Sequence, residues 1–197
     1  MPKQRITKEM ILDTAFTLTR EQGFEHVITK EIAERIGCSV QPIYSYYKNM
    51  EELKRDLFHR AVVFYGEFIT RNARGEKSFR SVGYAQIQFA REEPHLFWLL
   101  FMMKQESLNS FEDIYEKRSN KKVTEQIAEK YQIPTDRAKA LHLNMLVYTH
   151  GISSMLVTNS VQLEDVEIRN MLDAAFDAFL RKIRDNTVSE KKEMDYE

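Results

Sequence analysis

Residue types that cross-link or interrupt a fold are scarce in this 197-residue sequence, which has one cysteine, four prolines and six glycines. With Cys38 alone, neither an intramolecular disulfide nor a thiolate metal cluster can form, and this fits a reducing compartment. Cys38 occupies a turn position that usually holds a small apolar residue. We expect it to pack there, with a redox switch as the alternative.

Long apolar runs are also missing. The most apolar stretch, 96–103, is far shorter than the ~20 residues that a membrane-spanning helix needs. The basic residues near the N-terminus are not followed by the apolar segment of a signal peptide. We therefore predict a cytoplasmic protein without a membrane partner.

Neither sign of charge dominates, because the sequence has 29 Lys and Arg residues and 30 Asp and Glu residues. Bulk charge therefore does not point to DNA. The sequence has no Gly-rich phosphate loop, no nucleophile elbow and no acidic pair at a catalytic spacing. His142 and His150 stand about two helical turns apart, too far to share an ion. We predict no enzyme, no metal site and no cofactor.

Apolar residues recur at helical spacing along the whole chain, and this predicts an all-α fold. The first helix should end at Gly23, and Thr29 should cap a short second helix that ends at Gly37. Ser39 should cap a third helix. Pro42 lies in its first turn, where a missing N–H is tolerated.

Asn49 is expected to open a long fourth helix that closes over 71–78. Further helices are predicted near 79–92, 95–103, 111–131, 135–158 and 164–184, followed by a charged, frayed tail from Asp185. This organisation predicts three segments: a domain of three short helices over 1–48, a larger helical domain over 49–185, and a charged tail over 186–197.

The first three predicted helices have the pattern of a helix-turn-helix. Ala33 is small enough for a crossing helix, Gly37 tolerates a positive φ in the turn, and Ile43 can anchor the third helix inside. With Ile43 inside, helical geometry directs four other residues of the third helix outward. These are Val40, Gln41, Tyr44 and Ser45.

The outward face carries groups suited to DNA. Gln41 can form a bidentate pair with adenine, and Val40 can contact a thymine methyl group. Hydroxyl and ammonium groups nearby suit phosphate oxygens. The candidate DNA-contacting residues are Thr29, Lys30, Ser39, Val40, Gln41, Tyr44, Ser45, Tyr46 and Lys48. Tyr47 fits a phosphate contact and packing against the fourth helix equally well.

The segments 29–39 and 43–53 resemble the signature of the tetracycline-repressor (TetR) family, and 11–15 with Gly23-Phe24 resemble its first helix. Family members often carry other residues at Gln41, Tyr46, Tyr47 and Met50. Many family members carry a Lys at the position of Met50, and the Met50 side chain cannot bind a phosphate group as that Lys would. We expect Lys48 to make the phosphate contact instead. The resemblance implies a homodimer on a palindromic operator in double-stranded DNA.

Two later segments carry apolar stripes that could build the dimer as a four-helix interface, with burial inside one subunit as the alternative. The first stripe comprises Leu141, Met145, Tyr148, Ile152, Met155 and Leu156, beside the small residues Gly151, Ser153 and Ser154. The second comprises Ile168, Leu172, Ala175, Phe176, Phe179 and Ile183.

Aromatic and Met residues are dense in the middle of the chain, where they could form ordinary core or line an apolar ligand pocket. The candidate pocket residues are Phe68, Phe89, Trp98, Phe101, Met102, Tyr115, Met145 and Tyr148. The sequence therefore predicts a TetR-like DNA-binding regulator, a repressor released from its operator by a small apolar ligand. The alternative is a helical interaction or lipid-binding protein whose helix-turn-helix no longer binds DNA.

Overall fold

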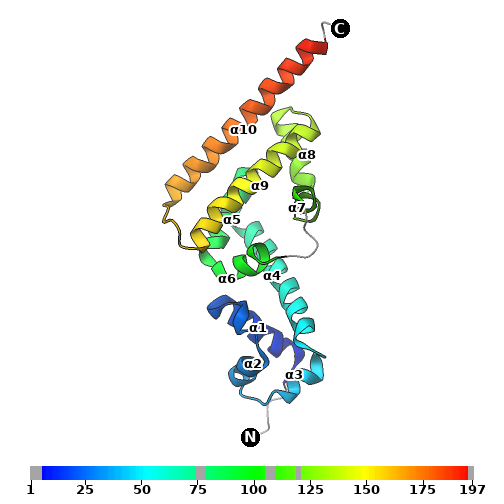
Figure 1. Cartoon of the computed structure of the whole chain (residues 1–197), viewed down its shortest axis with the longest axis vertical. Helices are drawn as coiled ribbons and strands as arrows, with labels where there is room; N and C mark the ends of the chain where they lie inside the picture. The colour runs from blue at the N-terminus through cyan, green and yellow to red at the C-terminus, as the bar shows by residue number, and fades with distance from the viewer. Residues whose placement is uncertain (1–5, 74–78, 105–109, 119–120, 195–197) are drawn as a thin grey trace. The chain divides into compact units, whose positions relative to one another are not determined.

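A computed structural model describes residues 6–73, 79–104, 110–118 and 121–194 of the chain. All regular structure in these residues is helical, which confirms the predicted all-α fold (Figure 1). The helices pack into two compact units. The N-terminal unit comprises 1–70 with 89–103, and the C-terminal unit comprises 71–88 with 104–197. The boundary predicted at residue 48, between a DNA-binding domain and a ligand-binding and dimerisation domain, stays a prediction.

The N-terminal unit begins with the helix-turn-helix. It contains α1 (Lys8–Gln22), the 3-10 turn η1 (Phe24–His26), α2 (Thr29–Ile36), α3 (Gln41–Tyr46), most of α4 (Met50–Asn72), α6 (Pro94–Phe97) and the π turn η2 (Trp98–Met102). Figure 1 shows α1, α2 and α3 as one compact group. Packing of α1 on α2, α3 and α6 holds the unit together.

The glycines end the first two helices as predicted. Gly23 has φ 111°, and its N–H donates to Thr19 O at the end of α1. Gly37 has φ 78°, the left-handed conformation that a residue without Cβ adopts at little cost. At the other end of α1, the side chain of Thr7 accepts a hydrogen bond from Met10 N at 3.1 Å.

Two predicted helix caps are wrong. Ile28 caps α2, and Thr29 is its first residue, with a hydroxyl group that bonds to side chains instead. Val40 precedes α3, where Ser39 was predicted as the cap. With Ser39 as the cap, Pro42 would be the third residue of the helix, one of the two positions whose N–H a cap side chain accepts, and proline has no N–H. The helix therefore begins one residue later than predicted.

The C-terminal unit contains most of α5 (Phe79–Glu92), together with α7 (Phe111–Arg118), α8 (Lys121–Tyr131), α9 (Thr135–Val157) and α10 (Asp165–Met194). Helices α9 and α10 run antiparallel and pack side by side (Figure 1). The buried faces of α8, α9 and α10 form one apolar core. Helix α9 ends at the predicted place, just before Asn159 adopts φ 53°.

Three helix predictions in the later chain need correction. The single helix predicted over 111–131 is two helices, α7 and α8, and residues 119–120 between them lie outside the described part. The helix predicted over 95–103 is the short α6 followed by a π turn. Helix α10 continues to Met194, because the segment predicted to fray from Asp185 contains no Gly or Pro.

Candidate nucleic-acid interface

The inner face of the helix-turn-helix is built as the spacing predicted. Ala33 is 4% exposed at the contact between α2 and its neighbours, and Ile43 of α3 is fully buried. Ile32 of α2 and Ile11 of α1 are also fully buried. Burial of these apolar side chains fixes the rotation of α3 about its own axis.

The fixed rotation leaves one side of α3 open. Val40 is 44% exposed and Tyr44 is 52% exposed, and Gln41 and Ser45 are exposed beside them. The Ser45 hydroxyl donates to Gln41 O at 3.1 Å, so its proton is already used inside the helix. The side chain of Gln41 is the amide group on this face that can read a base edge.

Tyr47 packs inside the unit and is not part of the open face. It is 1% exposed, and Lys8 Nζ lies 4.9 Å from the centre of its ring. Burial, with the negative charge of Asp56 nearby, raises the pKa of the Tyr47 hydroxyl well above its ordinary value. Of the two interpretations left open by the sequence, packing is therefore the correct one.

Hydrogen bonds connect Tyr44 to the first residues of α2 and α4. Its hydroxyl oxygen lies 3.2 Å from Thr29 Oγ1, and the Thr29 hydroxyl donates to Met50 Sδ at 3.2 Å. This chain of three side chains places the first residue of α2 and the first residue of α4 next to the exposed ring of α3.

Tyr46 connects α3 to the segment before α1. Its hydroxyl donates to the backbone oxygen of Ile6 at 3.0 Å, and the side chain is 39% exposed. The proton of Tyr46 is therefore used inside the protein, although its oxygen can still accept a bond. Because phosphate oxygens only accept hydrogen bonds, the bond to Ile6 competes with the predicted phosphate contact of Tyr46.

The lysines near the helix ends differ in what they contact. Lys8 forms an ion pair with Asp56 at 2.8 Å, a hydrogen bond that raises the pKa of Lys8 and lowers that of Asp56. Lys30 and Lys48 are exposed, and neither forms an ion pair within the described residues. Lys3 and Arg5, two further basic residues near the N-terminus of the sequence, lie outside the described part.

The start of α4 is capped next to Lys48. Asn49 Oδ1 accepts the backbone N–H of Glu52 at 3.0 Å, as the sequence predicted for a helix opening at Asn49. The Glu52 carboxylate accepts the backbone N–H of Lys48 at 2.9 Å. These two bonds fix the backbone that carries the Lys48 side chain.

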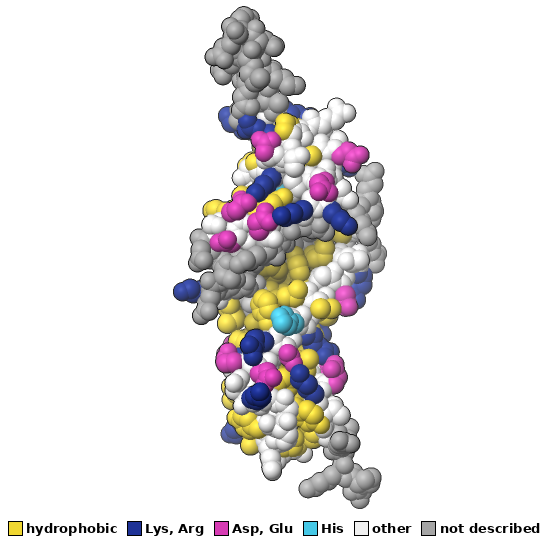
Figure 2. All heavy atoms as spheres, turned by 90° about the vertical axis from the view of Figure 1, so that its right-hand side faces the viewer, with side chains coloured by type: hydrophobic (Ala, Val, Ile, Leu, Met, Phe, Trp, Pro, Cys, Tyr) yellow, Lys and Arg dark blue, Asp and Glu magenta, His cyan; other side chains and the backbone are white. Residues whose placement is uncertain are grey.

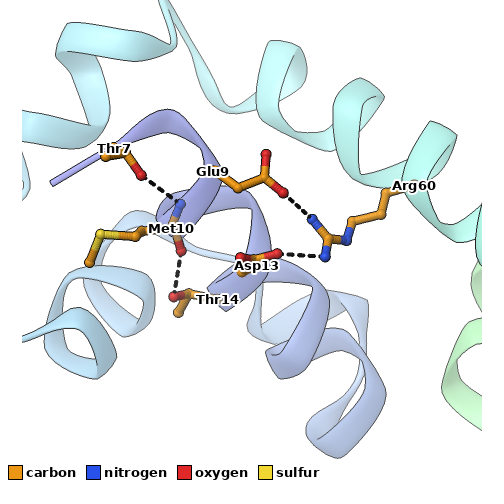
Figure 3. Close-up of polar contacts among 6 residues, drawn as sticks. All are labelled: Thr7, Glu9, Met10, Asp13, Thr14 and Arg60. Carbon is orange, nitrogen blue, oxygen red and sulfur yellow. Dashed lines mark hydrogen bonds and ion pairs between the residues drawn. The ribbon is translucent and has the colours of Figure 1, made fainter.

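Arg60 attaches α4 to α1 (Figure 3). Its two terminal nitrogens lie 2.9 Å from Glu9 Oε1 and 2.5 Å from Asp13 Oδ1. Acidic and basic side chains are likewise intermixed on the face drawn in Figure 2. Many charges of the N-terminal unit therefore hold its helices together, which explains why net charge was a poor indicator of an interface.

Residues 11–57, which include this whole open face, match the family described as bacterial regulatory proteins, tetR family. Residues 11–57 of the chain are therefore similar to the TetR family. The chain is 27% identical over 101 residues to the nucleoid occlusion factor SlmA of Haemophilus ducreyi, a match that covers 48% of the chain and 50% of that relative. It therefore spans about half the length of the curated relative it matches.

Among solved structures, the chain is similar to one described as a transcription regulator from Streptomyces coelicor. The sequence identity is 19%, the TM-score is 0.40, and the match covers 92% of the chain and 96% of that structure.

The eight candidate pocket residues fall into both units. In the N-terminal unit, Phe68 and Phe89 are buried with ring centres 5.2 Å apart, whereas Trp98 is 45% exposed. Phe101 and Met102 are half-buried there. In the C-terminal unit, Tyr115 and Met145 are buried and Tyr148 is half-buried. Their role in binding a ligand stays a prediction.

The C-terminal unit contains a cavity of about 580 Å³ that the sequence did not predict. Polar and charged side chains from the end of α4, from α5 and from α10 dominate its lining. The lining residues are Asn72, Arg80, Ser81, Tyr84, Gln88, Arg169, Leu172 and Asp173. One feature of the sequence could have indicated this cavity. Arg80, Tyr84 and Gln88 are spaced four residues apart, which puts them on one face of α5.

Two ion pairs and a stacked guanidinium group shape this cavity. Arg80 bonds to Asp173 at 2.6 Å and to Asp177 at 2.5 Å. The guanidinium carbon of Arg169 lies 3.9 Å from the centre of the Tyr84 ring. Burial is the main cause of a raised pKa at Tyr84.

Within the described residues, no group of three or more His, Cys, Asp or Glu side chains is arranged to hold a metal ion. None of the described helices is long and apolar enough to cross a membrane.

Proposed function

We propose that this chain is a DNA-binding transcription regulator that places α3 in the major groove of duplex DNA. The observation that carries the proposal is the division of α3 into two faces. Ile43 is fully buried, while Gln41 and Tyr44 are exposed on the opposite side. A short helix held this way can present side chains to base edges.

Each exposed group has a role in the proposed complex. Gln41 reads a base through its amide group, and Val40 provides the apolar contact to a thymine methyl group. Lys30 and Lys48 contact phosphate oxygens from the starts of α2 and α4, together with Thr29 and Tyr44. The remaining candidates, Ser39, Ser45 and Tyr46, lie exposed at the ends and outer side of α3.

The regulator acts as a homodimer, because one short helix reads too few base pairs to bind tightly alone. Much of both predicted apolar stripes is already buried within one chain; Leu141 and Phe176, for example, are fully buried. The outer face of α9 remains available. Val147 is 44% exposed and Met155 is 48% exposed, on either side of the exposed Gly151.

On this outer face, Gly151 has room for a close neighbour. A Cβ atom built on it would meet nothing within 4 Å in the same chain. Small exposed residues of α10, Ala174 and Ala178, provide a second surface on which helices can pack closely. We place the dimer contact on these faces of α9 and α10.

The regulator is a repressor that a small molecule releases from DNA. The volume of the cavity between α5 and α10 lies within the range of small-molecule sites, ~300–1,000 Å³. Its lining favours a ligand with polar groups, unlike the purely apolar ligand that the sequence indicated. A ligand that prefers one conformation shifts the population toward it by its difference in affinity.

Fluorescence anisotropy tests the DNA-binding proposal. The probe is a labelled duplex from the region upstream of the coding sequence of this chain, compared with a scrambled duplex of equal length over a range of salt. Sequence-specific binding that weakens as salt rises supports the proposal, because phosphate contacts release counterions. Equal binding to both duplexes, or none at all, rejects it.

A further inference from the structure

The sulfur atom of Met50 is the end point of the hydrogen-bond chain that begins on the open face of α3. Met50 is half-buried, and its Sδ accepts the Thr29 hydroxyl at 3.2 Å. Thr29 Oγ1 in turn lies 3.2 Å from the hydroxyl oxygen of Tyr44, which is 52% exposed.

The donors in this chain fix its direction. A threonine hydroxyl has one proton, and a thioether sulfur can only accept. While Thr29 donates to Met50, the bond between Tyr44 and Thr29 must therefore be donated by Tyr44. In this arrangement the Tyr44 proton points into the protein.

Binding to DNA requires the opposite direction at Tyr44. Phosphate oxygens only accept hydrogen bonds, so Tyr44 must turn its proton outward to contact one. Thr29 can then donate to the Tyr44 oxygen, and the bond to Met50 is lost. Because a thioether is a weak acceptor, this reversal costs little in the unmodified protein.

We infer that Met50 is a site of reversible oxidation that controls the phosphate contact of Tyr44; the inference rests on the proposed DNA-binding function. A peroxide such as hydrogen peroxide transfers one oxygen atom to Sδ. The O–O bond breaks, an S–O bond forms, the sulfur loses two electrons and the peroxide is reduced to water. The product is methionine sulfoxide, which methionine sulfoxide reductases convert back.

The sulfoxide changes which direction of the hydrogen bonds between Tyr44, Thr29 and Met50 is more stable. Its oxygen is a strong acceptor in the place of a weak one, so it holds the Thr29 proton and keeps the Tyr44 proton turned inward. Reversal then costs a full hydrogen bond. Oxidation of Met50 should weaken DNA binding roughly threefold to tenfold for each half-site.

The test uses the full chain, the upstream duplex, and hydrogen peroxide. Peptide mass spectrometry measures the sulfoxide at Met50, with the exposed Met103 as the internal reference. Anisotropy measures DNA affinity before oxidation, after oxidation, and after treatment with the reductases. We expect the affinity to fall with oxidation and to recover after reduction.

Met50→Leu is the matched variant, because leucine keeps the volume and cannot be oxidised. Its DNA affinity should not change with peroxide, although Met103 still reacts. An equal loss of affinity in this variant would assign the effect to other methionines and overturn the inference. So would full oxidation of Met50 in the natural chain without loss of binding.

A second readout does not depend on DNA. The Thr29 hydroxyl occupies a lone pair of Sδ, so Thr29→Val should speed the oxidation of Met50 relative to Met103 in the same molecule. An unchanged ratio would overturn the hydrogen-bond chain. If the unoxidised protein binds no upstream DNA, the proposed function fails. The ratio of Met50 oxidation to Met103 oxidation still shows whether the hydrogen bond from Thr29 slows the oxidation of Met50.

Discussion

Arg20 in α1 holds the carboxylate of Glu93, which directly precedes α6, through two hydrogen bonds, one of them between Nε and Oε2 at 2.8 Å. Glu93 is 8% exposed, and the guanidinium carbon of Arg20 lies 5.1 Å from the centre of the Phe64 ring. The bonds to Glu93 raise the pKa of Arg20. The pair joins the helix-turn-helix to the 89–103 segment within the N-terminal unit.

Glu93→Gln should lower the free energy of unfolding by about 1–3 kcal/mol, the range for a hydrogen bond to a charged group whose partner is left unpaired. The variant keeps the size of the side chain and removes the charge that the Arg20 guanidinium faces. Urea denaturation measures the change. Glu92→Gln, at an exposed neighbouring position, is the control and should leave the midpoint in place. Equal effects of the two substitutions would assign no special role to the ion pair.

The parts of the structure that the sequence predicted are set by local rules. Gly37 ends α2 because the turn needs a positive φ, and Asn49 opens α4 because its side chain accepts a nearby N–H. Ile43 lies inside because the spacing of apolar residues allows one rotation of α3. Each of these outcomes depends on residues within about two helical turns.

The parts that the sequence missed depend on contacts between distant residues. Arg20 and Glu93 are 73 positions apart, and nothing in either neighbourhood indicates the other. Tyr47 is part of the same run of tyrosines as the exposed Tyr44 and Tyr46, but it is buried, with Lys8 of α1 over its ring. The chain from Tyr44 through Thr29 to Met50 likewise requires three helix ends to meet.

A buried polar chain in the C-terminal unit leads to a prediction about pH. Thr124 Oγ1 lies 2.9 Å from His142 Nδ1 and 2.6 Å from the Tyr115 hydroxyl oxygen, joining α7, α8 and α9. Burial lowers the pKa of His142 to about 4 in the folded chain, against about 6.5 when unfolded. Between these values the unfolded chain binds the proton more tightly, so acid favours unfolding.

The folded chain should therefore lose about 3 kcal/mol of stability through His142 alone as the pH falls from about 6.5 to about 4. His142→Asn keeps a polar group near the position of Nδ1 and removes the titration. Urea denaturation at several pH values compares the two proteins. The variant should be less stable at neutral pH and should lose less stability on acidification. Parallel curves for the two proteins would show that burial of His142 does not govern the acid response.

The proposed dimer face predicts the effect of a charge placed on it. Val147→Glu should convert the homodimer to a monomer, because an interface between apolar helix faces would then bury an unpaired carboxylate. Light scattering after gel filtration measures the mass. Val63→Glu makes the same change at a residue of α4 that is 61% exposed, and it should leave the dimer intact.

Circular dichroism must show equal helix content in these two variants. A lower mass of Val147→Glu then reflects dissociation of the dimer and not unfolding of the chain. A natural chain that is monomeric at all concentrations would contradict the homodimer. A Val147→Glu dimer as stable as that of the natural chain would move the interface to another surface.

Gln41 leads to the sharpest prediction about sequence recognition. Gln41→Ala should relax the preference for one base pair in each half-site and weaken binding to the preferred sequence by about 1–3 kcal/mol, the value of one bidentate base contact. Anisotropy with a set of duplexes that differ by single base pairs locates the affected position. Gln22→Ala, the same change at an exposed residue at the end of α1, should leave the preference and the affinity intact. If Gln41→Ala instead weakens every duplex equally, Gln41 contacts the DNA backbone, and the base must be read by another residue of α3.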